Sequence, residues 1–250
     1  MCTPDFIIIG AQKGGTTSLF RYLSEHPRIR LPETKEIHYF DLNHEKGLHW
    51  YLSHFPPSDG RGLLTGEASP YYLYHPLVPS RMSGALPDLK LIVMLRDPVD
   101  RAYSHYHHNR RHGYEELGSF EAAVEMEESR LNGQEEALIQ GSLSHSPSHQ
   151  HCSYIDRGLY RRQIERWLEH YPADRFHFIR SEDFYRDPHG QTGKVCRFLG
   201  LDPMPEFQPE IHNGNSYPEM PARLRQSLTK IFREEEEKLI RLIGMGALRT

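Results

Sequence analysis

The sequence has few cysteines, no long apolar run and no excess of positive charge. Its three cysteines, Cys2, Cys152 and Cys196, are odd in number and far apart, so they predict neither a disulfide framework nor a zinc site. No segment approaches the roughly 20 consecutive apolar residues that span a bilayer, and we expect no signal peptide before the first apolar segment. The formal net charge of -4 argues against a nucleic-acid partner. We expect a cytoplasmic protein with free thiols, no metal and no membrane segment, and the oligomeric state stays open.

A chain of 250 residues is long enough for one large α/β domain, which we expect to span 1–250. Apolar runs predict buried strands, and amphipathic patterns predict helices between them. The expected strands are 6–9, 63–67, 89–95 and 175–180, and the expected helices are 16–26, 47–55, 98–111, 119–132, 158–171, 188–199 and 221–243. This alternation predicts a P-loop-like, three-layer fold with a central parallel sheet covered by helices on both faces. The polar stretch 133–153 is expected to be a mobile surface loop.

A glycine-rich turn joins the first strand to the first helix and is the strongest functional signal in the sequence. Free backbone N–H groups and the helix dipole converge at such a turn and favour an anion. The turn and the start of the helix supply one positive charge, two glycines and three hydroxyl donors. These residues are Lys13, Gly14, Gly15, Thr16, Thr17 and Ser18. The segment therefore predicts a phosphate-binding loop.

The spacing of this loop departs from the Walker A pattern of ATP- and GTP-binding proteins. Gly10 and Gly15 have the required separation, but Thr16 stands where the pattern has lysine. The strand 89–95 is followed by Arg96, whereas a magnesium-dependent site needs a carboxylate there. We therefore expect a phosphate compound that is handled without a metal. A nucleotide-dependent kinase and a catalytically inactive nucleotide-binding domain remain the alternatives.

Arg96 and Ser104 are candidates for a second phosphate site. Ligands of open α/β sheets bind beyond the carboxyl ends of the strands, where both the loop and Arg96 are expected. Ser104 lies about two helical turns further on, on the helix face that Arg101 and His108 share. A salt bridge for Arg96 and a surface hydroxyl for Ser104 are the alternative interpretations.

The segment 9–18, taken with 95–98 and Ser104, resembles the sulfotransferases that use 3′-phosphoadenosine 5′-phosphosulfate (PAPS). The likeness is strongest to the heparan-sulfate type and its bacterial relatives, and it extends to 35–41, 66–71 and 217–220. The resemblance implies that residues 13–18 bind the 5′-phosphosulfate and that Arg96 and Ser104 bind the 3′-phosphate. Donor contacts are also implied for the loop before Tyr217, at Asn213, Gly214 and Asn215.

Sulfuryl transfer needs a base for the acceptor proton and a cation for the leaving oxygen. Lys13 is the expected cation. Glu36 and His38 are the candidate bases, because alternation in an extended segment 31–41 places both on one side. The resemblance implies the glutamate, so Glu36 is favoured, with His38 second. A general base is expected to have a raised pKa.

Glu67, Ser69 and Tyr71 follow a predicted strand and are expected to orient the acceptor. Heparan enzymes carry a lysine where this chain has Ala68, and a basic pair where it has Asn213 and Asn215. A polysulfated acceptor is therefore not expected. The sequence predicts transfer to a hydroxyl, less readily an amine, of a carbohydrate or natural product.

Overall fold

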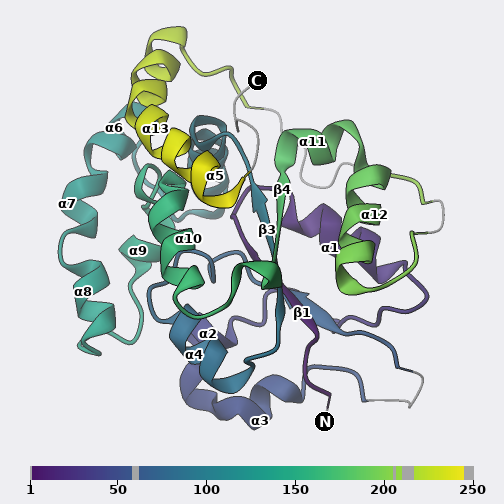
Figure 1. Cartoon of the computed structure of the whole chain (residues 1–250). Helices are drawn as coiled ribbons and strands as arrows, with labels where there is room; N and C mark the ends of the chain where they lie inside the picture. Colours follow the sequence, from purple (N-terminus) through teal and green to yellow (C-terminus); the bar gives the residue numbers. More distant parts are fainter. Residues whose placement is uncertain (1, 58–61, 205–206, 210–216, 245–250) are drawn as a thin grey trace. The chain divides into compact units, whose positions relative to one another are not determined.

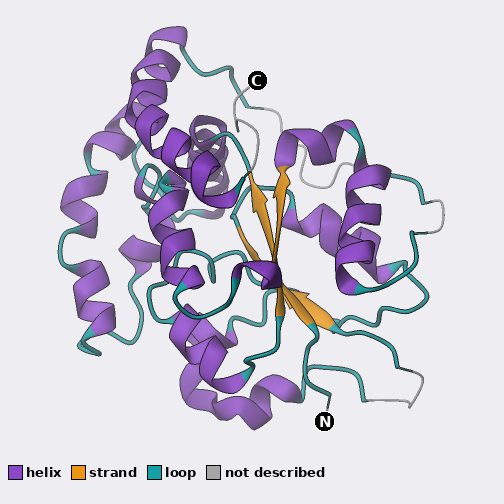
Figure 2. Ribbon diagram, in the orientation of Figure 1, coloured by secondary structure: helices purple, strands orange, loops and turns teal. Residues whose placement is uncertain are grey.

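The computed structural model describes residues 2–57, 62–204, 207–209 and 217–244. Four strands form one sheet in the order β2-β1-β3-β4, and every neighbouring pair is parallel (Figures 1 and 2). The strands are β1 (Phe6–Gly10), β2 (Gly66–Ala68), β3 (Lys90–Leu95) and β4 (Phe176–Arg180). The predicted α/β fold with a parallel sheet is confirmed. β2 begins later than expected, because Leu64 forms only an isolated bridge with Ile29.

Helices connect the strands, as the alternating pattern predicts. Their bounds are α1 (Thr16–Ser24), α2 (Tyr39–Leu42), α3 (Gly47–Leu52), α4 (Val78–Ala85), α5 (Pro98–His112), α6 (Phe120–Glu125), α7 (Glu127–Leu131), α8 (Gln134–Ile139), α9 (Pro147–His151), α10 (Tyr160–Leu168), α11 (Ser181–Arg186), α12 (Pro188–Leu199) and α13 (Ala222–Ile243). The single helix expected at 119–132 is two helices that meet at Met126, and α11 was not predicted. None of the described helices is long and apolar enough to cross a membrane.

Two compact units make up the chain. The first comprises 1–95 and 167–214 and contains the sheet, and the second comprises 96–166 and 215–250 and contains α5 to α9 and α13. A single domain over 1–250 stays a prediction.

In the first unit, side chains alternate across the sheet. Ile8, Ile92 and Met94 face a core that α1 and α12 complete with Leu19 and Val195. In the second unit, α13 packs along α5, where Leu228 and Phe232 join Val99, Ala102 and Tyr103. These cores hold the strand ends and helix starts from which functional groups project.

The stretch 133–153 is not the irregular loop that its composition predicted. It contains α8 and α9, and both Leu138 and His149 are buried. Gly133 adopts a left-handed conformation before α8, while the Ser146 hydroxyl accepts a hydrogen bond from the backbone N–H of His149 at the start of α9. Capping and burial, which composition does not report, make this segment helical.

Candidate active site

The glycine-rich turn lies at the carboxyl edge of the sheet, between the end of β1 and the start of α1. The backbone N–H of Ala11 donates to the carbonyl of Met94 at 2.8 Å, and that of Gly14 donates to the carbonyl of Ala11 at 2.9 Å. Lys13 and Gly15 have left-handed backbones, with φ of 69° and 99°. The turn is therefore tightly folded and anchored to the end of β3.

Gly14 and Gly15 lie so close to other parts of the fold that a Cβ atom at either position would come within 3.0 Å of a neighbouring atom. A Cβ atom on Gly14 would lie 2.7 Å from the carbonyl oxygen of Met94 and 2.9 Å from that of Ala11. Gly15 precedes α1 and has no side chain with which to cap it. The N–H groups of the first helical turn are thus not covered by a capping side chain, which is the arrangement that phosphate groups occupy. The residues fit a phosphosulfate.

The hydroxyl groups of the first turn of α1 differ in accessibility. Thr16 and Ser18 are 4% and 2% exposed, whereas Thr17 is partly exposed. A residue from a distant part of the chain also supports the loop. The Ser181 hydroxyl, at the start of α11, donates to the carbonyl of Gly14 at 2.7 Å.

The segment that carries Glu36 and His38 is not extended, contrary to the prediction for 31–41. Both residues have left-handed backbones, with φ of 63° and 53°. The predicted sides nevertheless hold, because Ile37 and Tyr39 are each 4% exposed. Tertiary hydrogen bonds impose the turn: the N–H of Glu36 donates to the carbonyl of Ala68 at 3.2 Å, which places the segment at the end of β2.

Glu36, His38 and Asp41 form a charged chain. His38 Nδ1 lies 2.7 Å from Asp41 Oδ2, and His38 Nε2 lies 3.5 Å from Glu36 Oε2. Lys35 makes an ion pair with the other oxygen of Glu36. The Asp41 side chain is fully buried, whereas that of Glu36 is 43% exposed. Glu36 is therefore the member of this chain that a ligand can reach most easily.

The pKa values of the two candidate bases are shifted in opposite directions. Burial raises the pKa of Glu36, but hydrogen bonding to His38 and the charge of Lys35 outweigh it and lower that pKa to about 2. Burial lowers the pKa of His38, but hydrogen bonds to Asp41 and Glu36 outweigh it and raise that pKa to about 10. The expectation of a raised pKa on Glu36 is wrong, because the neighbouring cations stabilise the carboxylate. At neutral pH, Glu36 is an anion and His38 a cation.

Glu67 is fully buried and all its hydrogen bonds point inward. Its Oε1 accepts from the hydroxyls of Tyr51 at 2.9 Å and Tyr72 at 3.0 Å, and its Oε2 accepts from Ser69 at 2.7 Å. Burial raises the pKa of this carboxyl, and the three hydroxyl donors partly offset the rise.

The same hydroxyl groups hold the segment of Glu36. Tyr72 Oη accepts from the N–H of Tyr39 at 2.9 Å, and Ser69 Oγ accepts from the N–H of His38 at 3.4 Å. Ser69 is 0% exposed and Tyr71 is 4% exposed. The three residues predicted to orient the acceptor thus lie inside the unit. Three residues of this hydrogen-bond network were not predicted from the sequence: Tyr51, Tyr72 and Asp41. Of these three, only Asp41 could have been predicted, because it follows His38 by three residues.

Arg96 and Ser104 belong to the second unit. Arg96 follows β3 directly in the chain, and its carbonyl accepts a hydrogen bond from the Tyr160 hydroxyl at 3.0 Å. Asp97 caps α5 as its position predicts, accepting from the N–H groups of Val99 and Asp100 at 2.9 Å each. Ser104 is 6% exposed. The predicted donor contacts at Asn213, Gly214 and Asn215 lie outside the described residues.

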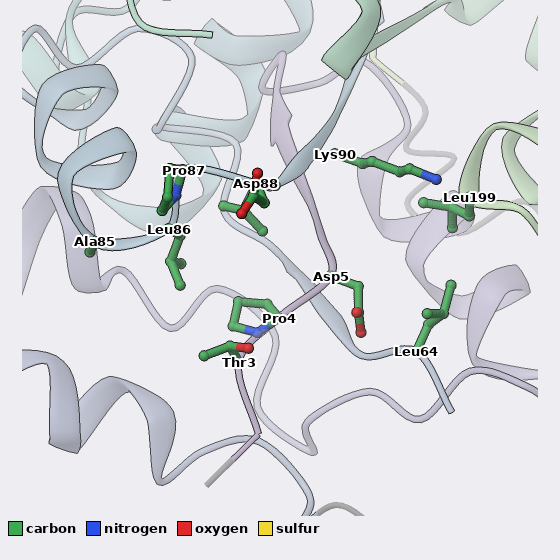
Figure 3. A pocket seen from close by; sticks show the side chains of 11 residues that line it. Thr3, Pro4, Asp5, Leu64, Ala85, Leu86, Pro87, Asp88, Lys90 and Leu199 are labelled. Atoms are coloured by element: carbon green, nitrogen blue, oxygen red, sulfur yellow. The ribbon is translucent and has the colours of Figure 1, made fainter. Parts of the chain in front are cut away.

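A cavity of about 380 Å³ lies at the opposite, amino edge of the sheet (Figure 3). Its charged groups are already used within the fold. Asp5 accepts a hydrogen bond from the N–H of Thr65 at 2.7 Å, Lys90 donates to the carbonyl of Phe198 at 2.8 Å, and Asp88 pairs with Arg175 at 3.4 Å. Within the described ranges, no three or more His, Cys, Asp or Glu side chains cluster as metal ligands would. The groups with reactive chemistry are at the carboxyl edge.

Known proteins are similar to this chain in sequence and in fold. The sulfotransferase domain family matches residues 3–242. Human heparan sulfate glucosamine 3-O-sulfotransferase 3B1 is 36% identical over 199 residues, which cover 79% of this chain and 46% of that protein. The membrane-associated sulfotransferase kil1 of Dictyostelium discoideum is 28% identical over an alignment 312 residues long. The alignment covers 98% of this chain and 66% of that protein. The crystal structure of a sulfotransferase from Alicyclobacillus acidocaldarius superimposes with a TM-score of 0.78 and 33% identity, covering 100% of both chains.

The chain belongs to the sulfotransferase domain family, whose enzymes use PAPS as the sulfuryl donor. The predicted family and its class of enzyme are thereby confirmed. The chain spans 66% of the length of the Dictyostelium relative and 46% of that of the human one.

Proposed function

We propose that this chain transfers the sulfuryl group of PAPS to a hydroxyl group of a carbohydrate or natural product, with no metal ion. The proposal rests on one observation: an ionised, accessible Glu36 and a phosphate-type loop lie at the same edge of one sheet. The loop suits the anionic donor, and the carboxylate suits the proton of the acceptor.

In this proposal, Lys13 to Ser18 hold the 5′-phosphosulfate, and Arg96 and Ser104 hold the 3′-phosphate. The start of α1, which no side chain caps, supports the first assignment. The second rests on the resemblance and on the position of Arg96 directly after β3. Asn213, Gly214 and Asn215 stay predicted donor contacts.

Glu36 takes the base role in preference to His38. A histidine that is protonated up to a pKa of about 10 has no lone pair with which to accept a proton at neutral pH. Glu36 is ionised and 43% exposed, so it can accept one. A low pKa makes it a weaker base, but displacement of His38 or Lys35 from Glu36 as the acceptor binds would raise its basicity.

The reaction then divides among these residues. The acceptor oxygen bonds to sulfur, Glu36 takes the hydroxyl proton, and the bond from sulfur to the bridging oxygen breaks. Lys13 stabilises the negative charge on that oxygen, so the 5′-phosphate leaves with the electron pair. Electrostatic stabilisation by a lysine supplies what a divalent metal supplies in phosphoryl transfer.

Glu67 and Ser69 act by positioning in this proposal. Glu67 accepts from the hydroxyls of Ser69 and Tyr72. Those hydroxyls accept from the N–H groups of His38 and Tyr39 and thereby fix the direction of Glu36. Tyr71 is also buried in the first unit. It packs beside His75, and the centroids of the two rings are 5.3 Å apart.

We propose that the acceptor carries less negative charge than heparan sulfate, after which the human relative is named. Ala68 replaces the lysine that the heparan enzymes carry, and its neighbour Glu67 has no basic partner among the contacts of its carboxylate in the described chain. A neutral hydroxyl acceptor fits this environment better than a polysulfate.

Substitution of Glu36 tests the proposal. Purified wild-type chain and Glu36→Gln are incubated with ³⁵S-labelled PAPS and a panel of hydroxyl and amine acceptors, in EDTA and in excess Mg²⁺. We expect transfer by the wild type to be equal in both conditions. Glu36→Gln should lose roughly 100-fold or more in rate, because general-base catalysis contributes about 10²–10⁴-fold.

The control is binding of 3′-phosphoadenosine 5′-phosphate (PAP), which Glu36→Gln should retain unchanged. Full turnover by Glu36→Gln would remove this residue from the mechanism. Activity with ATP and Mg²⁺ but none with PAPS in EDTA would favour the kinase alternative instead.

A further inference from the structure

Arg180, the last residue of β4, has donor groups that the fold does not use. Its side chain is 17% exposed, and an ion pair joins Nη1 to Asp183 Oδ2 at 3.8 Å. Nε and Nη2 are buried, and no hydrogen-bond partner for either lies within the described part of the chain. An unsatisfied buried donor costs about 1–3 kcal/mol and more when it is charged, so such a group calls for a ligand.

The two unused nitrogens define the kind of ligand. Nε and Nη2 lie on the same edge of the planar guanidinium, so they can donate two parallel hydrogen bonds to one group. Carboxylates and phosphates accept such a pair, and the full charge of arginine favours an anion.

Arg180 stands beside the glycine-rich turn. It pairs in register with Leu95 at the carboxyl end of the sheet, and the next residue, Ser181, donates its hydroxyl to the carbonyl of Gly14 at 2.7 Å. Further along α11, the Tyr185 hydroxyl lies 2.9 Å from where a Cβ atom of Gly15 would stand. The start of α11 therefore lies against the donor loop, and an anion held by that loop is the nearest anionic ligand the proposed function supplies.

We propose that Arg180 binds a phosphate group of the donor nucleotide through Nε and Nη2. The proposal rests on the proposed function, because it takes the nucleotide at the loop to be PAPS or its product PAP. Neither the strand pattern of β4 nor the glycine-rich motif singles out this arginine.

Arg186 is the matched control for Arg180. It lies on α11, it contacts the other oxygen of the same aspartate through Nη1 at 3.3 Å, and its side chain is 68% exposed. Substituting either arginine removes one positive charge and one contact to Asp183. Only Arg180 has the unused buried donors.

Isothermal titration of PAP, 3′-AMP and 5′-AMP into wild type, Arg180→Gln and Arg186→Gln tests the proposal. We expect Arg180→Gln to weaken PAP binding roughly 10- to 100-fold, as the loss of hydrogen bonds from a charged donor implies. A matching loss for 3′-AMP places the contact at the 3′-phosphate, and a matching loss for 5′-AMP places it at the 5′-phosphate. Arg186→Gln should stay within about twofold of wild type, because an exposed ion pair contributes little.

Stability without ligand separates binding from a structural role. Arg180→Met keeps the aliphatic length and removes the buried charge, so we expect its unfolding midpoint without nucleotide to equal or exceed that of wild type. PAP affinity of Arg180→Gln within twofold of wild type, or equal losses in both glutamine variants, would overturn the proposal. Failure of the wild type to bind PAP would instead reject the proposed function.

Discussion

Two neighbouring side chains, Glu36 and His38, would decide the protonation chemistry of the proposed site. Each sits in a backbone conformation that non-glycine residues rarely adopt, and His38 lies between two carboxylates. Such strain persists only where surrounding contacts hold it, and here the buried Asp41 and the end of β2 do so. The arrangement makes Glu36 the ionised group and His38 the fixed cation.

The contacts of His38 with Glu36 and Asp41 predict that the stability of the folded protein depends on pH. The folded state raises the pKa of His38 from 6.5 to about 10, so it binds the proton more tightly than the unfolded chain does. The resulting stabilisation is full below about pH 6.5 and is lost as the pH rises through about 10. We expect His38→Gln to be destabilised by roughly 1–3 kcal/mol at pH 6, because Asp41 loses a buried partner.

Urea denaturation of wild type and His38→Gln at pH 6, 8 and 10 measures this difference. The difference in the free energy of unfolding should be largest at pH 6 and smallest at pH 10. A difference that is constant over this range would mean that His38 is not charged in the folded state.

At the scale of elements, buried hydroxyl groups connect β2 to α2. The Tyr72 hydroxyl donates to Glu67 and accepts from the N–H of Tyr39, so one side chain satisfies a buried carboxylate and a helix start. Buried polar groups of this kind are costly when left with a missing partner. The position of Glu36 therefore depends on the hydroxyl group of a fully buried tyrosine.

Removal of the Tyr72 hydroxyl tests this dependence. We expect Tyr72→Phe to destabilise the protein by roughly 1–3 kcal/mol. We also expect kcat to fall roughly 10- to 100-fold, because a small displacement of a catalytic group is expensive. PAP affinity should not change, since the loop does not depend on this bond.

The matched control is Tyr171→Phe. That hydroxyl is also buried and donates to the carbonyl of Leu86 at 2.8 Å, beside the cavity at the amino edge. It should lose similar stability while keeping kcat. Equal falls of kcat in both variants would mean that the effect is general loosening rather than positioning.

At the scale of the whole molecule, the parallel sheet brings functional groups to one edge. The loop after β1, the segment tied to β2 and the first turn after β4 all lie at carboxyl ends of strands, where α/β proteins bind ligands. A ligand that binds at this edge should therefore stabilise the folded chain against unfolding.

PAP is predicted to stabilise the chain by mass action. At 100 times its Kd, a ligand that binds only the folded state adds about 2.7 kcal/mol to the free energy of unfolding. Denaturation with and without PAP should show this gain in the wild type and in Gly84→Ala, whose added Cβ meets nothing within 4 Å. Gly14→Ala should show little gain, because its Cβ would collide with two carbonyl oxygens; a full gain in that variant would contradict the role of the loop.

The sequence alone predicted much of this protein because its strongest signals are local. A continuous apolar run such as 89–95 is typical of a buried strand, a proline after Asp97 favours a helix start, and a glycine-rich turn between a strand and a helix indicates an anion site. The order of these elements was enough for the parallel sheet, and the motifs were enough for the family.

Only the tertiary structure decided which groups carry charge and where they point. The pKa values of Glu36 and His38 depend on Lys35 and Asp41 in a turn that strand alternation did not predict. Glu67 looked like a ligand-facing residue and is instead enclosed by two tyrosines from distant positions. Hydrogen bonds between residues far apart in the chain leave no periodic pattern, so electrostatics and burial become visible only in the folded molecule.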